Sequence, residues 1–358
     1  MTATTRVDAA PLGAAACPHS DRRDDPSAVA AWLFACCALV FAMIVVGGVT
    51  RLTHSGLSIT EWAPILGTLP PLSDAQWHEA FLKYQQTPEF RLVNSAMTLD
   101  AFKGIYWWEY VHRLLGRVIG AAFLLPYLWF LARRRVPAGY AVKLLGIFAL
   151  GGLQGALGWY MVRSGLVDDP RVSPFRLTAH LGLAFAIFGA MLWVAMSLRA
   201  PGVAGDRRAS PAPCGHARAA VALIFAMVLT GGFVAGIRAG FAYNTFPLMN
   251  GHIVPPEIFM LVPTWTNFFW NMATVQFDHR IVALSLAIVV PWLWWRVRRL
   301  PNAGARSAAN ALFAMLALQI ALGIATLLLV VPLPLAALHQ AGAVVLFALA
   351  LRLAHALR

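Results

Sequence analysis

Long apolar runs separated by short polar stretches dominate this chain. Eight of them are long enough to cross the roughly 30 Å hydrocarbon layer of a membrane, which takes about 20 residues in a helix. They lie near residues 29–49, 109–131, 142–162, 177–198, 218–238, 275–296, 306–330 and 334–355. Because lipid offers the backbone no hydrogen-bond partners, these runs are expected to be helices rather than open strands. The pattern predicts an all-α, polytopic membrane protein.

Two longer segments, 50–108 and 239–274, separate some of these runs and contain amphipathic stretches. Ser73 to Gln76 has the pattern of a capping box, which predicts the start of a helix. Thr98 is expected to cap a further short helix that ends near Tyr106. We expect both segments to lie on the outer surface and to cover the ends of the membrane helices.

Composition and charge agree with a membrane protein. Of the 358 residues 59% are apolar and only 12% are charged, which is too little charge for a soluble domain of this size. The net charge of +13 does not indicate nucleic-acid binding, because the arginines gather in the short loops on one side of the predicted helices. The positive-inside rule then predicts a bacterial inner membrane protein with both termini in the cytoplasm, including a disordered tail over residues 1–28.

The second half of the chain repeats the first. Four pairs of short stretches match: Gly47-Gly48 with Gly231-Gly232, 109–113 with 276–280, 154–158 with 319–323, and 178–182 with 337–342. An even number of helices in each half gives both halves the same orientation in the membrane. We predict two pseudo-symmetric four-helix bundles over residues 29–199 and 218–358, joined by a cytoplasmic linker over 200–217.

Each half carries two histidines near the outer ends of its second and fourth helices: His112 and His180, then His279 and His339. Two imidazoles that face each other across a bundle can ligate the iron of one porphyrin. A single buried histidine is more often a hydrogen-bonded core residue, but four matched histidines favour two haem sites. A zinc or copper site is less favoured, because the two halves share no cluster of thiolates or carboxylates.

One difference between the halves concerns an acid. Glu109 precedes His112 by three residues and shares its helix face, whereas the matching residue Gln276 cannot ionise. A carboxylate beside a metal ligand can accept protons or stabilise developing positive charge, so we predict that the first half performs chemistry. The second half would hold an electron-transfer or structural haem. The alternative for Glu109 is an acid favoured by the helix dipole.

Three arginines near the outer ends of the helices are candidates to pair with haem propionates: Arg51, Arg113 and Arg280. Snorkelling of long basic side chains to the membrane interface explains their positions equally well.

Residues 50–58, 102–113 and 277–280 resemble those of the haem A synthase family. The likeness is to the branch shared by alphaproteobacteria and mitochondria, because the outer segments contain no cysteine pairs. The resemblance implies that haem O, made by a haem O synthase, is the substrate. Its C8 methyl group would be oxidised to a hydroxymethyl group and then to a gem-diol, which loses water to leave the formyl group of haem A.

The resemblance also implies residue assignments and partners. His112 and His180 would ligate the substrate haem, His279 and His339 would ligate haem b, and Glu109 would be the catalytic acid. Haem A would pass to cytochrome oxidase assembly factors, electrons would pass to an acceptor that the sequence does not name, and the protein would form homo-oligomers in the lipid membrane.

Two other functions remain open at this point. A dihaem b-type electron carrier, such as a quinol-oxidising subunit without methyl oxidation, would explain the histidines, but two equivalent haems would need no contrast between Glu109 and Gln276. A transporter with duplicated halves would explain the repeat but not the histidines.

Overall fold

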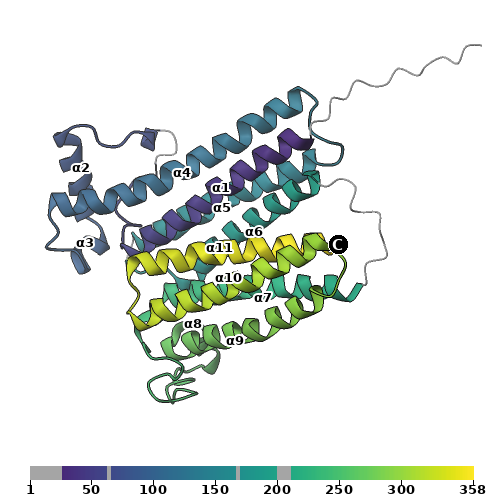
Figure 1. Cartoon of the computed structure of the whole chain (residues 1–358). Helices are drawn as coiled ribbons and strands as arrows, with labels where there is room; N and C mark the ends of the chain where they lie inside the picture. The colour runs from purple at the N-terminus through teal and green to yellow at the C-terminus, as the bar shows by residue number, and fades with distance from the viewer. Residues whose placement is uncertain (1–25, 63–65, 167–169, 200–210) are drawn as a thin grey trace, which may run out of the picture.

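The computed structural model describes residues 26–62, 66–166, 170–199 and 211–358 (Figure 1). Eight helices in this part of the chain are long and apolar enough to cross a membrane. They are α1 (Pro26–Leu52), α4 (Leu99–Ala132), α5 (Ala141–Gly165), α6 (Pro174–Arg199), α7 (Pro211–Gly236), α9 (Met272–Val297), α10 (Ala303–Leu328) and α11 (Leu333–Ala356). Each coincides with one predicted run, so the chain is an all-α, multi-pass membrane protein.

Most of the predicted tail and linker lies outside the described residues. The described parts of both, 26–28 and 211–217, belong to α1 and α7, so these helices begin earlier than predicted.

The connecting segments contain short helical elements. They are η1 (Leu66–Thr68), α2 (Asp74–Gln85), α3 (Pro88–Leu92), η3 (Ala239–Phe241), η4 (Thr264–Thr266) and α8 (Asn267–Trp270). The predicted capping box is confirmed: the Ser73 side chain accepts from the backbone N–H of Gln76, and the Gln76 side chain accepts from the backbone N–H of Ser73. These elements lie at the end of the molecule opposite the C-terminus (Figure 1).

The predicted end of a short helix near Tyr106 is wrong. Thr98 caps α4, but that helix continues for 34 residues into the membrane run. At about 1.5 Å per residue it is roughly 50 Å long, which exceeds the hydrocarbon thickness of roughly 30 Å. Its first turns therefore extend beyond the membrane, where Phe102 stacks on Tyr84 of α2 and Tyr106 meets Trp77 edge-on. No proline stops the helix in this stretch, and the packing on α2 stabilises it.

Within each half, the four long helices form a closed ring of contacts. In the first half α1 contacts α4 and α6, and α5 contacts α4 and α6; in the second half α7 contacts α9 and α11, and α10 contacts α9 and α11. The halves meet through α1, α6, α7 and α11 (Figure 1). The predicted pseudo-symmetry between the two rings stays a prediction.

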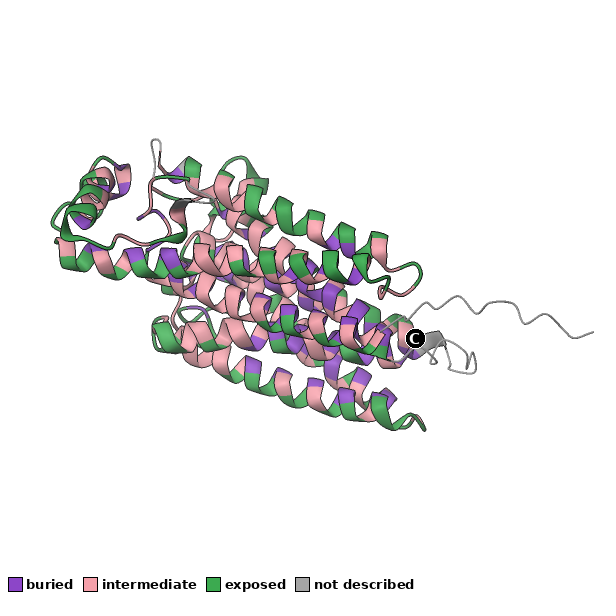
Figure 2. Ribbon diagram, turned by 90° about the horizontal axis from the view of Figure 1, so that it is seen from above, coloured by how far each residue is buried: buried purple, intermediate pink, exposed green. Residues whose placement is uncertain are grey.

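One hydrophobic core runs through both halves. Leu33, Phe185, Ile224 and Phe347 are buried, and the rings of Phe185 in α6 and Phe347 in α11 are 5.6 Å apart across the junction. In Figure 2 the buried residues concentrate between the helices, while the outward faces are exposed or intermediate. Apolar side chains on those outward faces suit contact with lipid.

Candidate functional site

The two histidines of the first half lie beside helix glycines. A Cβ atom at Gly47 of α1 would stand 3.1 Å from Nε2 of His112 in α4, and one at Gly158 of α5 would stand 3.0 Å from Cε1 of His180 in α6. His112 and His180 are close enough for their charges to interact. The missing side chains at the two glycines therefore leave the space in which the imidazoles lie.

The second half has the same arrangement at the matching residues. A Cβ atom at Gly231 of α7 would stand 3.3 Å from Cε1 of His279 in α9, and one at Gly323 of α10 would stand 2.9 Å from Cε1 of His339 in α11. His279 and His339 also lie within range of each other's charge. The structure thus brings the predicted histidines together in pairs, one pair in each half.

The second glycine of each matched Gly-Gly pair faces the other half. A Cβ atom at Gly48 of α1 would overlap the Gln340 side chain of α11, and one at Gly232 of α7 would stand 3.2 Å from Cα of Thr178 in α6. Close approach of the two halves therefore requires a small residue directly next to each histidine-facing glycine.

Two matched glutamines hold the histidine backbones. Gln154 donates from Nε2 to the carbonyl of His180 at 3.0 Å, and Gln319 donates to the carbonyl of His339 at 2.8 Å. Nδ1 of His339 lies 3.2 Å from the same Gln319 nitrogen, whereas Nδ1 of His180 is buried without a partner among the described residues. The repeat contained both glutamines, but spacing alone gave no reason to link them to the histidines.

Thr230 orients His279. Its Oγ1 lies 2.9 Å from Nδ1 of His279 and donates to the carbonyl of Met227 at 2.9 Å. Because the hydroxyl hydrogen goes to that carbonyl, Oγ1 is free to accept an N–H from Nδ1, which leaves Nε2 available as a ligand. Sequence reasoning missed Thr230, which lies 49 positions from the histidine.

Glu109 is 2% exposed and is held by hydrogen bonds at both of its carboxylate oxygens. Oε2 accepts from the Ser58 hydroxyl at 2.7 Å and from the backbone N–H of Ile59 at 2.8 Å. Oε1 accepts from Nε of Arg113 at 3.0 Å and from its NH2 group at 2.6 Å. Arg113 also donates to the carbonyls of Ile59 and Glu61. The acid is thereby fixed to the outer segment that follows α1.

Gln276 makes the corresponding contacts without a charge. Its Oε1 accepts from Arg280 at 2.9 Å, and its Nε2 donates to the carbonyl of Ala239 at 2.8 Å. Arg280 also donates to carbonyls of the outer segment that follows α7: Tyr243, Thr245, Pro247 and Leu248. Each half therefore joins its second helix to its own outer segment, but only the first half does so with a carboxylate.

Arg51 connects the two halves. It donates to the carbonyls of Ala235 and Gly236 at 3.2 and 3.3 Å, while its Nε is buried without an acceptor among the described residues. Nearby, NH2 of Arg238 lies 3.2 Å from Nδ1 of His54. Sequence reasoning missed this second contact, although Arg238 follows Gly231 by the same seven residues that separate His54 from Gly47.

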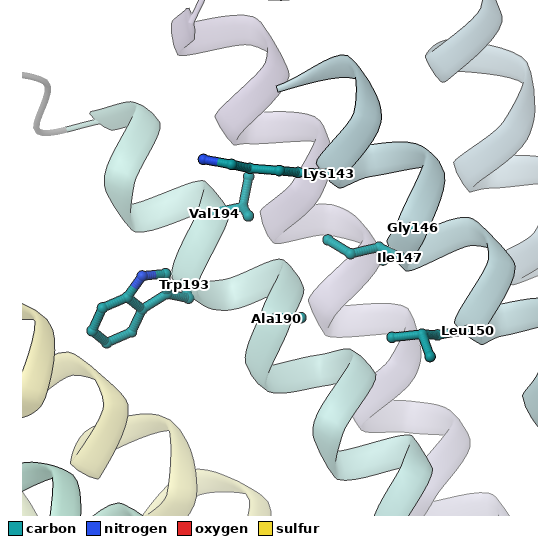
Figure 3. Close-up of a pocket in the computed structure, with 7 residues that line it drawn as sticks. All are labelled: Lys143, Gly146, Ile147, Leu150, Ala190, Trp193 and Val194. Atoms are coloured by element: carbon teal, nitrogen blue, oxygen red, sulfur yellow. The ribbon is translucent and has the colours of Figure 1, made fainter. Parts of the chain in front are cut away.

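No group of three His, Cys, Asp or Glu side chains that could hold a metal ion occurs in the described ranges. Paired histidines suit an iron that brings its other ligands in a porphyrin ring. An open pocket of about 570 Å³ between α5 and α6 has no predicted site residue in its lining, which consists of Lys143, Gly146, Ile147, Leu150, Ala190, Trp193 and Val194 (Figure 3).

Comparisons with known proteins agree over nearly the whole chain. A family model described as cytochrome oxidase assembly protein matches residues 30–351. A relative from Nitrosospira multiformis named Heme A synthase is 61% identical over 337 residues, which are 92% of this chain and 93% of the relative. Relatives of the same name from Nitrosomonas eutropha and Paracoccus denitrificans are 55% and 47% identical, over 90% and 92% of this chain and 92% and 87% of their own lengths.

Proposed function

Because this chain belongs to the family of cytochrome oxidase assembly proteins, we propose that it acts as a haem A synthase, which oxidises the C8 methyl group of haem O to the formyl group of haem A. The observation that carries this proposal is one difference between two otherwise matched sites. Both halves present paired histidines beside helix glycines, but only the first half places a carboxylate, Glu109, one turn from its first histidine. That contrast suits one half that performs chemistry and another that assists it.

In the first half, His112 and His180 would hold the iron of haem O. The buried Nδ1 of His180 lacks a partner among the described residues, and the rings of His112 and His180 pack against Gly47 and Gly158, which leave room for them. Haem O brings a farnesyl tail, which needs a site open to lipid, and propionates, which favour the polar outer end.

In the second half, His279 and His339 would hold haem b as a resident cofactor. The residues fit: iron at Nε2 requires the proton on Nδ1, and Thr230 is placed to accept that N–H from His279. Gln319 holds the backbone of His339. Haem b bound there would supply a one-electron redox centre to the second half.

Glu109 would act on the substrate through a charge fixed in place. It shares a helix face with His112, and Ser58, Ile59 and Arg113 already orient it. A preorganised negative charge stabilises positive charge that develops in a transition state, because no reorganisation is needed when the reaction occurs. Gln276 provides the same shape in the second half without that charge.

The three candidate arginines differ in which of their N–H groups are available to donate to a propionate. Arg51 and Arg280 each keep a buried Nε without an acceptor among the described residues. Arg113 donates from Nε and NH2 to Glu109, from NH2 to the carbonyl of Ile59, and from NH1 to the carbonyl of Glu61. We therefore favour Arg51 for the substrate haem and Arg280 for haem b, with Arg113 contributing its remaining NH1 hydrogen.

The proposed setting is the bacterial inner membrane, with both termini in the cytoplasm and the outer segments on the other side. The basic loops support this orientation, and the start of α1 and the end of α11 lie at the same end of the molecule (Figure 1). Haem O synthase would supply the substrate, and cytochrome oxidase assembly factors would receive the product. The protein would form homo-oligomers, and a separate electron acceptor would take up the electrons released by the reaction.

Haem extraction tests the proposed function. Cells that make haem O should accumulate formyl-bearing haem only when this chain is present, as measured by chromatography of extracted haems. If purified protein holds two haems but such cells contain no haem A, the chain is a dihaem electron carrier instead.

A further inference from the structure

Glu89, in the outer segment, is a buried acid that the proposed reaction has not used. It lies in α3, directly after the helix cap Thr87 and Pro88. The residue is 7% exposed, and its Oε2 is buried without a hydrogen-bond partner among the described residues. By contrast, the side chains of Glu61 and Glu79 in the same segment are 65% and 66% exposed and both pair with Lys83. Burying an ionised carboxyl oxygen without a partner costs free energy, which protonation of the group reduces.

Charged and titratable groups from four other parts of the fold face Glu89. Glu109 approaches from α4, Arg51 from the end of α1, Arg238 from the segment after α7, and Tyr84 from α2. Arg238 in turn contacts His54. The acid thus lies within electrostatic range of Glu109 and of one arginine from each half of the chain.

In these surroundings Glu89 populates both its protonated and its ionised form near neutral pH. Burial, and to a lesser extent the charge of Glu109, raise the pKa of Glu89, while Arg51 and Arg238 lower it; together these effects give a pKa of about 7. A group that is partly protonated at working pH both accepts and donates protons efficiently.

Glu109 is poorly arranged for the same task. Four hydrogen bonds, from Ser58, Ile59 and twice from Arg113, occupy its two oxygens. A proton arriving at Glu109 would have to displace one of these donors, whereas Oε2 of Glu89 has none to displace. The two acids are therefore suited to different tasks: Glu109 provides a fixed charge and Glu89 exchanges protons.

We propose that Glu89 is the proton-exchanging residue of the first-half site, taking up protons released near Glu109 and passing them to the outer solution. This inference rests on the proposed oxidation of haem O. Its second stage is R–CH2OH → R–CHO + 2 H⁺ + 2 e⁻, and the two electrons would go one at a time to the haem redox centre proposed for the second half and then to the separate electron acceptor. For each proton, an O–H bond forms at a carboxylate oxygen of Glu89 and breaks when that proton passes to water at the outer surface.

The test compares the full-length, haem-loaded protein with Glu89→Gln, Glu89→Asp and Glu79→Gln. Conversion of haem O is followed by chromatography between pH 5.5 and 8.5. We expect Glu89→Gln to lower the rate at least tenfold and to remove the change in rate near pH 7, with both haems still bound. Glu89→Asp should retain a pH-dependent rate with a shifted midpoint, and Glu79→Gln should match the unmodified protein. An unchanged rate and pH profile in Glu89→Gln would overturn the inference.

An infrared titration gives a second readout that requires no turnover. The unmodified protein should show a carboxylic C=O band that disappears as pH rises through about 7, and Glu89→Asp should shift it. Absence of any carboxyl group that titrates between pH 6 and 8 would also overturn the inference. Failure of the unmodified protein to make formyl-bearing haem would instead refute the proposed function, while this titration would still decide whether Glu89 exchanges protons.

Discussion

Gly158 and His180 face each other so closely that a Cβ atom on the glycine would stand 3.0 Å from Cε1 of the imidazole. At Gly155, three residues earlier on α5, a Cβ atom would meet nothing within 4 Å. Two glycines of one helix therefore differ sharply: one makes room for a proposed haem ligand and the other does not.

Gly158→Ala should displace His180 and lower the conversion of haem O at least tenfold, with loss of substrate haem from the purified protein. Alanine favours a helix over glycine by roughly 0.5–1 kcal/mol, so the loss should not come from unfolding of α5. Haem content and thermal stability measured on the same sample separate these causes. Gly155→Ala is the matched control and should keep both haem and activity; equal effects of the two substitutions would contradict the assignment.

Glu109→Gln should reduce formation of haem A by about two to three orders of magnitude, as expected when one preorganised charge is lost from a reacting site. Both haems should stay bound, because Gln276 shows that a glutamine satisfies the arginine in this arrangement. Product analysis by chromatography checks the rate, and optical spectra check haem content. Asp100→Asn removes an exposed acid from the start of the same helix and should leave conversion unchanged. Full activity in Glu109→Gln would exclude the proposed electrostatic contribution.

Thr230→Val should raise the reduction potential of haem b by on the order of tens of millivolts, because the iron-bound imidazole loses the acceptor for its Nδ1–H and becomes a weaker electron donor. A redox titration followed by absorbance measures this change. Thr326→Val removes a helix threonine whose hydroxyl donates to the carbonyl of Leu322, and the potential of this variant should match that of the unmodified protein. An unshifted potential in Thr230→Val would argue against His279 as an iron ligand.

Glu89 should make the stability of the protein depend on pH. The folded pKa of about 7 lies above the ordinary value of 4.5, so the folded state binds more protons than the unfolded state in this range. Stability must then fall as pH rises from about 4.5 to about 7. Glu89→Gln cannot ionise, so its melting temperature should be close to that of the unmodified protein at pH 5 and higher than it at pH 8. A difference independent of pH would mean that the acid is not buried.

His279→Ala or His339→Ala should abolish the haem b spectrum and leave the first-half histidines in place. Absorbance of the purified, reduced protein measures the loss. His252→Ala, in the exposed part of the outer segment, is the control and should keep the spectrum. Retention of haem b in both histidine variants would move the second site elsewhere.

The sequence by itself determined which parts of the chain cross the membrane and which residues repeat. Eight apolar runs, the matched histidines and the contrast between Glu109 and Gln276 are visible without a structure, because hydropathy and spacing are local properties of the chain. The same local reasoning placed the end of a helix near Tyr106, where packing against α2 instead continues α4 outward.

Only the tertiary structure decided what each of these residues contacts. Ser58 reaches Glu109 across 51 positions, and the acceptor for the His279 ring lies 49 positions away in α7. The burial of Glu89, in a short polar stretch typical of a solvated loop, brings it within range of charged groups from α1, α4 and the segment after α7. Such contacts form where side chains of one helix pack between those of a neighbouring helix. The periodicity of one helix does not specify which side chain of another helix will lie opposite.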